Sequence, residues 1–192
     1  NIPNKQMGVV EFDIPDDLNL EIEKEYLLAV KIAKTEESQN SVQLPFSAMA
    51  SWNSNKWESD QDCPISIHAD TSDRELEEGS ATLLCVDIGN ESPTMSTGMV
   101  VAIIGIPACM EVHTNRLEEL KEQGVFDFFE IHGNDAVFYW RQMQSKFFES
   151  FCFEVTAVVA GTCTGQLSQA YVYYNDEHRA WGKDPISVIV SR

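Results

Sequence analysis

The sequence predicts an all-β protein: an antiparallel β-sandwich with one short exposed α-helix, preceded by the last strands of another β-sandwich. Short apolar runs recur along the whole chain and end at turn residues, as in "SATLLCVDIGN" (residues 80–90) and "TGMVVAIIGIP" (residues 97–107). Only one stretch has the apolar spacing of a helix. A chain of 192 residues has room for one large domain or two small ones.

Three strand-like runs fill residues 1–53. "VVEFDIP" alternates apolar and acidic residues, and "YLLAVKIA" and "SVQLPFSAMASW" follow. Three strands cannot cover their own apolar face, so we expect them to complete a larger sandwich. The polar, turn-rich run "NSNKWESDQD" then predicts a linker at residues 54–62, with a second domain at residues 63–192.

Strand signals resume in the second domain, where we expect about nine strands. Glu75–Gly79 has the composition of a charged turn, and Gly133–Asp135 that of a hairpin turn. Asn175-Asp176 is predicted to turn the chain after a strand rich in tyrosine. The expected strands lie within residues 63–72, 80–90, 97–107, 126–132, 136–140, 147–160, 168–174 and 186–190.

The single helix is predicted in "HTNRLEELKEQG" (residues 113–124). Asn115 can cap the first turn, with Glu118 reaching back, and Gly124 can end the helix. Leu117 and Leu120 form a narrow apolar stripe, so the remaining faces are expected to meet water.

The charge of the chain limits its partners. Thirty-one acidic residues against 13 basic ones give a net charge of −18, which argues against nucleic acid and anionic membrane surfaces. No apolar run approaches the ~20 residues of a membrane span. The chain begins at Asn1 without a methionine, so we expect a mature or excised part of a longer protein.

Five cysteines are too scattered for a zinc site. Cys85 and Cys152 stand in apolar runs, where buried free thiols are common. Cys163, within "GTCTG", is either a loop thiol or half of a disulfide, and an odd count leaves at least one thiol unpaired. The triplet that starts at Asn90, Asn-Glu-Ser, is a candidate glycosylation site in a secreted setting.

Catalytic and cofactor motifs are absent from the sequence. The four histidines lack the pair spacings of a metal site, so we expect unrelated surface histidines, His178 among them. There is no Gly-x-Ser-x-Gly elbow and no phosphate-binding glycine loop. We therefore predict no catalytic residue, no metal and no cofactor, and a protein that is not an enzyme.

The order of several motifs resembles the C-terminal receptor-binding domain of the α-macroglobulin family, which includes thioester-containing protease inhibitors and complement-like proteins. In order, they are "VVAIIGIPACMEV", the helix "NRLEELKEQG", "FDFFEIHGNDAVFYWRQM" and "FEVTAVVAGTCTGQLSQAYVYYNDEHRAW". The segment "SQAYVYYNDE" (residues 168–177) is the most specific of these marks. Residues 1–53 are similar to the last strands of the CUB-like domain that precedes this module in the family.

This resemblance implies a non-enzymatic recognition region of a larger parent. In the family, a protease cuts a bait region, the molecule rearranges, and an internal thioester acylates the attacker or a surface. The implied partners are the thioester and macroglobulin domains of the parent, a protein receptor or a target protease. The implied location is extracellular or periplasmic, and the implied setting is innate immunity.

The resemblance also points to the helix as the partner-binding element. Receptor-binding members carry two lysines one turn apart on this helix. The matching positions here are Thr114 and Glu118, and Lys121 is the nearby lysine. Vertebrate members also bridge the first cysteine of the domain to one near the C-terminus; Cys63 matches the first, while the C-terminus here has no cysteine.

Two other functions remain open from the residues alone. An adhesin or carbohydrate-binding module would use exposed tryptophans, with Trp52, Trp57 and Trp181 as candidates for a sugar platform. A β-sandwich hydrolase would need carboxylates that converge in a cleft.

Overall fold

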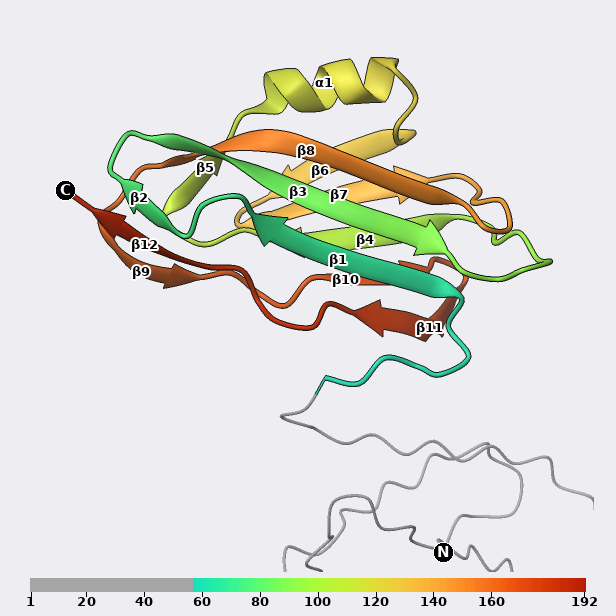
Figure 1. Ribbon diagram of the computed structural model, residues 1–192. Coiled ribbons are helices and arrows are strands. Elements are labelled where there is room, and N and C mark those ends of the chain that lie inside the picture. The colour runs from blue at the N-terminus through green and yellow to red at the C-terminus, as the bar shows by residue number, and fades with distance from the viewer. Residues whose placement is uncertain (1–56) are drawn as a thin grey trace, which may run out of the picture. The chain divides into compact units, whose positions relative to one another are not determined.

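The computed structural model describes residues 57–192, apart from the side chains of Asp176 and Glu177. The chain divides into two units, Asn1–Ser51 and Trp52–Arg192. The strands expected in residues 1–53 lie outside the described residues. The described part contains twelve strands and one helix and has the predicted all-β sandwich architecture (Figure 1).

Two antiparallel sheets form the sandwich, and a small third sheet extends one end of it (Figure 1). The four-stranded sheet has the order β1-β3-β8-β5, and the five-stranded sheet has the order β11-β10-β4-β7-β6. The four-stranded sheet contains β1 (Ile65–Thr71), β3 (Ala81–Asn90), β8 (Phe148–Ala157) and β5 (Met110–Val112). The five-stranded sheet contains β11 (Asn175–Trp181), β10 (Gln169–Val172), β4 (Val100–Gly105), β7 (Asp135–Trp140) and β6 (Phe128–His132). The third sheet contains β2 (Glu75–Glu77), β12 (Ser187–Ser191) and β9 (Gly161–Thr164).

The structure has more strands than predicted, because four of them carry weak local signals. The predicted charged turn at Glu75–Gly79 contains β2, which pairs in parallel with β12 from the far end of the chain. The expected turn at Asn175-Asp176 is wrong: the chain turns at Tyr173-Tyr174, and Asn175 already begins β11. The other two unpredicted strands, β5 and β9, span only three and four residues.

The core lies between the two main sheets and is rich in aromatic rings. Phe126, Phe138, Trp140 and Phe151 pack together with ring-centroid distances of 4.9 to 6.5 Å. Buried aromatic side chains stabilise a fold by about 1.5–3 kcal/mol each. The alternating inward residues of β3 and β8 complete this core, as the period-two sequence pattern predicts.

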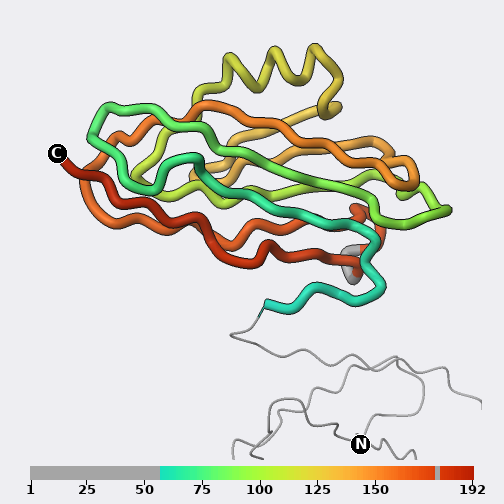
Figure 2. The backbone as a smooth tube through the Cα atoms, viewed as in Figure 1, coloured from blue at the N-terminus to red at the C-terminus, as the bar shows by residue number. Residues whose placement is uncertain are grey.

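Helix α1 (Thr114–Glu122) closes one open edge of the sandwich. It connects β5, an edge strand of one sheet, to β6, an edge strand of the other, and it contacts β6 and β8. At the opposite edge, β1 contacts β10 and β11 (Figure 2). Leu117 and Leu120 are buried beneath the helix, as predicted.

The two predicted helix ends have different outcomes. Gly124 ends the helix as expected, with φ of +79° and its N–H donating to the Lys121 carbonyl at 3.0 Å. The predicted Asn115 cap is wrong, because His113 occupies the cap position and forms no side-chain capping bond. Asn115 is the second residue of the helix, two positions beyond the cap position that a capping side chain occupies.

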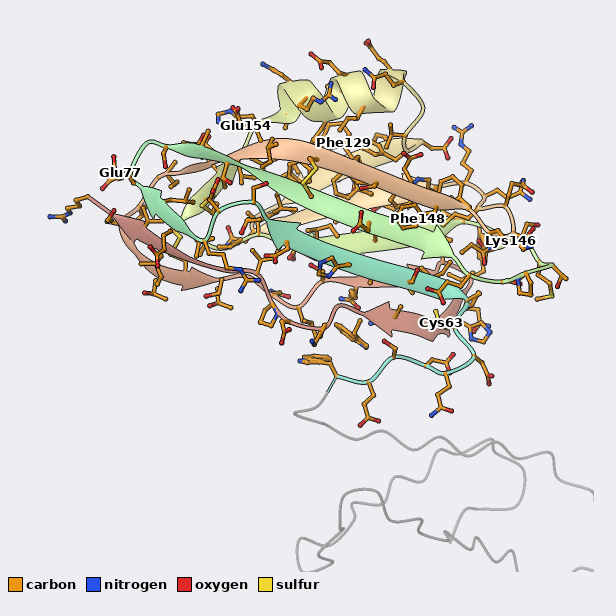
Figure 3. The ribbon with its side chains drawn as sticks, in the orientation of Figure 1. Cys63, Glu77, Phe129, Lys146, Phe148 and Glu154 are labelled. Atoms are coloured by element: carbon orange, nitrogen blue, oxygen red, sulfur yellow. A yellow bond between two sulfur atoms is a disulfide. The ribbon has the colours of Figure 1, made fainter. Side chains whose placement is uncertain are left out.

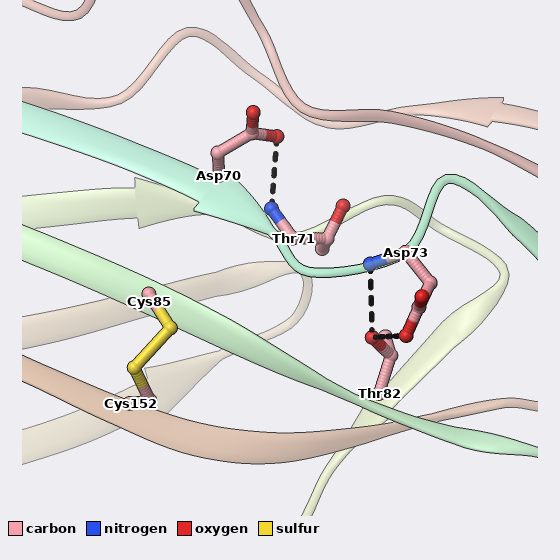
Figure 4. Close-up of a disulfide and its surroundings, with 6 residues drawn as sticks. All are labelled: Asp70, Thr71, Asp73, Thr82, Cys85 and Cys152. Atoms are coloured by element: carbon pink, nitrogen blue, oxygen red, sulfur yellow. Dashed lines mark hydrogen bonds between the residues drawn. A yellow bond between two sulfur atoms is a disulfide. The ribbon is translucent and has the colours of Figure 1, made fainter.

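Two disulfides correct the cysteine prediction. Cys85 and Cys152 stand directly opposite each other on β3 and β8 and are bridged, with 4.1 Å between their Cα atoms (Figure 4). Cys109 is bridged to Cys163 on β9, which decides between the two alternatives for Cys163. The register of β3 against β8 makes the first pair, and the packing of the turn before β5 against β9 makes the second, so spacing in the sequence could not reveal them. Among the described residues, Cys63 is the free thiol, and burial raises its pKa.

Candidate functional site

The expected partner-binding residues share one face of α1. Thr114, Glu118 and Lys121 stand at positions i, i+4 and i+7, which fall on one side of a helix. Thr114 and Glu118 are exposed and Lys121 is half-exposed, while the leucines face the sheets. Figure 3 shows the polar side chains of α1 projecting away from the sandwich. The structure thus brings the three predicted residues together on an accessible surface.

Four charged side chains of α1 are paired within the helix. Lys121 Nζ lies 3.2 Å from Glu118 Oε2, and Arg116 Nη1 lies 2.8 Å from Glu119 Oε2. Lys121 Nζ also lies 5.8 Å from the centre of the Phe128 ring, a cation–π distance. A partner would therefore meet an acid–base pair, where receptor-binding members of the α-macroglobulin family are expected to present two lysines.

A groove runs between the start of α1 and the outer face of the four-stranded sheet. Its volume is about 380 Å³, and it contains the outward side of the Cys85–Cys152 bridge. His113 Nε2 lies 2.7 Å from Thr156 Oγ1, which holds the imidazole at the rim. The lining residues are Leu83, His113, Asn115, Arg116, Glu119, Cys152 and Glu154.

A second, larger groove lies beside the end of β11 and has a volume of about 550 Å³. Trp57 and Trp181 form one side of it, with their ring centroids 4.3 Å apart. The sequence singled out both tryptophans but not Gln166 or Gln169. Gln169 comes to lie beside Trp181 only through the pairing of β10 with β11. Besides the tryptophans, the lining residues are Gly165, Gln166, Leu167, Gln169, Lys183 and Pro185.

Residues 57–62, the second half of the predicted linker, lie against β11. The Asp60 N–H donates to the Arg179 carbonyl at 2.9 Å, and the Trp181 N–H donates to Ser59 Oγ at 2.9 Å. His178 Nδ1 lies 2.8 Å from Asp60 Oδ2, and this hydrogen bond holds the pKa of Asp60 below its ordinary value. His178, expected as an unrelated surface residue, therefore joins the entry segment to the sheet.

Asn90, the candidate glycosylation residue, has a structural role in the domain. Its side chain is fully buried, and Nδ2 donates to the carbonyl oxygens of Met95, Met143 and Gln144 at 3.0 to 3.3 Å. Its Oδ1 accepts from the Ser92 N–H at 3.1 Å. A glycan on Nδ2 would displace these bonds, so the folded domain does not present Asn90 for attachment. The triplet alone carried no information about burial.

The remaining histidines are not grouped. His68 is exposed on β1, and His132 pairs with Glu130 at 2.7 Å, which lowers the pKa of Glu130. Within residues 57–192, no group of three or more His, Cys, Asp or Glu side chains is placed to hold a metal ion. That same stretch contains no helix long and apolar enough to cross a membrane.

Comparisons with known proteins find similarity in structure alone. No protein-family model matches the sequence, and no curated protein sequence matches it. Among solved structures, a crystal structure of a Salmonella α2-macroglobulin mutant matches 67% of this chain, with 15% identity and a TM-score of 0.57. Escherichia coli α2-macroglobulin activated by porcine elastase matches the same share, with 16% identity and a TM-score of 0.53.

The match lies in the C-terminal part of those proteins. It covers 9% of the Salmonella chain, but 23% of an Escherichia coli fragment that runs from domain MG7 to the C-terminus, with a TM-score of 0.52. The chain thus spans between about a tenth and a quarter of these α2-macroglobulin structures. The fold expected from the sequence motifs, that of the C-terminal β-sandwich of α2-macroglobulins, is confirmed.

Proposed function

We propose that this chain is a non-enzymatic C-terminal recognition region of an α-macroglobulin-like protein. The observation that carries the proposal is the shared fold with the C-terminal part of bacterial α2-macroglobulins, over 67% of the chain. Motif order in the sequence and the fold agree independently, although the matched structures are only 15–16% identical.

In this proposal, α1 is the recognition element. It is the one helix of the described residues, it stands outside both sheets, and its leucines already satisfy its apolar face. Its outward face therefore remains free to contact another protein without unfolding the sandwich. Such a face, with paired charges and Thr114 beside them, suits a polar partner surface better than a hydrophobic one.

The longer protein would trap proteases or tag surfaces through a thioester, outside the cytoplasm. Residues 1–53 would complete its CUB-like domain, and the thioester and macroglobulin domains would be the partners of this region. The two disulfides of the described residues support an oxidising compartment.

The test uses the full-length protein, incubated with pancreatic elastase. We expect a covalent elastase adduct on a denaturing gel, and we expect pretreatment with methylamine to prevent it. In the same samples, hydrogen exchange of residues 113–124 is expected to accelerate after cleavage, as α1 loses contacts with other domains. Residues 151–157 of β8, in the core, provide the internal control.

Two results would contradict the proposal in different ways. Without an adduct, the parent is not a thioester trap. With an adduct but unchanged exchange over α1, the trap is correct and the recognition role of α1 is wrong.

A further inference from the structure

We propose that the groove beside Trp57 and Trp181 binds a neutral oligosaccharide. The groove is open and has a volume of about 550 Å³, within the range of about 300–1,000 Å³ common for small-ligand sites. The proposal concerns this surface alone and does not depend on the α-macroglobulin-like function.

The tryptophans provide an apolar platform at the surface. Trp57 is 59% exposed and contacts Trp181 at an interplanar angle of 41°. Trp140 in the core is only 3% exposed, so most of its indole is removed from water. The exposed indole of Trp57 would gain free energy if a ligand covered it. The electron-rich face of an indole attracts the slightly positive C–H groups on one side of a sugar ring. Trp57 packs against Trp181, so the part of the Trp57 indole that remains exposed can stack on one ring of a sugar chain.

Amide side chains supply the polar half of the site. Gln169 Oε1 accepts from Arg179 Nη1 at 3.0 Å, which leaves the Gln169 amide hydrogens for a ligand. Gln166 is exposed at the rim. An amide offers a donor and an acceptor side by side, the pattern that vicinal hydroxyl groups match.

The groove is held rigid before a ligand arrives. The Arg179 guanidinium lies 4.9 Å from the centre of the Tyr171 ring and 5.7 Å from that of Trp181, so it fixes the side chains around it. Gly105 and Gly165 let the backbone of the groove wall lie against β4, because a Cβ at Gly105 would come within 2.1 Å of the Gln166 carbonyl oxygen. Binding to a preformed site loses little conformational entropy.

Charge indicates that the ligand is neutral. The chain has a net charge of −18, so an acidic polysaccharide would be repelled at long range. The groove itself is lined by no carboxylate and contains Lys183, with Arg179 next to it, so a cationic ligand is disfavoured at short range. An uncharged, hydroxyl-rich chain avoids both costs.

The test titrates the 192-residue chain with cellohexaose, with chitohexaose and with a hyaluronan hexasaccharide, followed by tryptophan fluorescence and calorimetry. We expect a neutral hexasaccharide to bind with a Kd below about 1 mM. Trp57→Ala is expected to weaken that binding at least tenfold. The matched control is Tyr174→Ala, which removes an aromatic ring that is 83% exposed at the Tyr173-Tyr174 turn, outside the groove.

Circular dichroism and the melting temperature establish that each variant is folded, and Trp181→Phe provides a milder second variant. The proposal is overturned if neither neutral sugar binds at concentrations up to about 1 mM. It is also overturned if Trp57→Ala binds the sugar with the same Kd as the unmodified chain. A third contrary result is tighter binding of the acidic hyaluronan fragment, or of a proline-rich peptide added as a competitor, than of either neutral hexasaccharide.

Discussion

Asn90 is the residue that joins two loops at one end of the sandwich. Its amide donates to carbonyl groups from residues 95 and 143–144, which belong to the loops before β4 and before β8. The side chain has no access to water, so these bonds are made within the protein interior and removing them takes hydrogen-bond partners from the carbonyl groups.

Asn90→Ala is therefore expected to lower the free energy of unfolding by about 2 kcal/mol. The Met95 carbonyl loses its donor, while the Met143 and Gln144 carbonyls keep only the backbone N–H groups of Thr97 and Phe147. Urea denaturation measures this change. Asn115→Ala, at an exposed helix position without a capping bond, is the matched control and is expected to change stability by less than about 0.5 kcal/mol. Equal effects of the two changes would show that the Asn90 bonds do not matter.

The pair between Asp60 and His178 predicts a pH dependence. The folded pKa of Asp60 lies below its ordinary value of 3.8, chiefly through the hydrogen bond from His178. A carboxyl whose pKa is lowered on folding stabilises the protein above its ordinary pKa, and this stabilisation disappears as the pH falls through the folded pKa.

Asp60→Asn should therefore lower the melting temperature at pH 7. The difference in melting temperature between this variant and the unmodified chain should shrink as the pH is taken below 3.8. Melting curves from pH 7 to about pH 2 test this. Asp62→Asn, two residues away and exposed, controls for the general loss of an acidic charge. A difference that stays constant across the range would exclude a role for Asp60 ionisation.

At the scale of elements, α1 depends on Gly124 to end in the correct direction. Gly124 has φ of +79°, in the left-handed region that costs residues with a Cβ about 1–2 kcal/mol. The turn leads directly to β6, so it also sets where α1 lies over the edge of the sandwich.

Gly124→Ala is expected to destabilise the domain by about 1 kcal/mol, measured by thermal or urea unfolding. Gly98→Ala is the matched control, because Gly98 does not have a positive φ and a Cβ there would meet no atom within 4 Å. That change should be neutral or slightly stabilising. A neutral Gly124→Ala would mean that the turn relaxes at no cost.

The two disulfides join different kinds of elements. Cys85–Cys152 joins neighbouring strands of one sheet, whereas Cys109–Cys163 joins the segment before β5 to the third sheet. The bridges close loops of similar size, with sequence separations of 67 and 54 residues. Loop entropy therefore predicts a similar stabilisation from each, about 4 kcal/mol.

Replacing either pair by serine should lower the free energy of unfolding by about 2–4 kcal/mol. Urea denaturation of the two double variants tests this, with Cys63→Ser as the control for losing a thiol without a bridge. A loss below about 1 kcal/mol for either pair would contradict a structural role for that bridge.

At the scale of the whole molecule, the core cluster and the sheets around it lie within residues 57–192. The core residues come from β1 to β12, and the chain divides before Trp52. The first strand, β1, is tied both to β3 and, through the segment before it, to β11. The fragment Trp57–Arg192 should therefore fold without the preceding residues.

We expect this fragment to unfold in one cooperative transition, at a melting temperature within a few degrees of the corresponding transition of the full chain. Calorimetry measures both. The fragment Cys63–Arg192, which lacks the contacts of Ser59 and Asp60 with β11, should melt at a lower temperature. If the two fragments melt together, the entry segment does not belong to the folded unit.

The sequence by itself determined the fold class, the helix and most of the long strands. These follow from local patterns: Leu117 and Leu120 mark a helix face, and alternation marks β3 and β8. The order of motifs also pointed to the α-macroglobulin fold, which the structural comparison confirms, and it placed Thr114, Glu118 and Lys121 on one helix face.

Only the tertiary structure decided what depends on contacts between distant segments. The register of β3 against β8 bridged Cys85 to Cys152, the packing of two loops buried Asn90, and the entry segment brought Asp60 to His178. The pairing of β10 with β11 likewise placed Gln169 beside Trp181. Such contacts join residues that are far apart in the chain, and no local pattern encodes them.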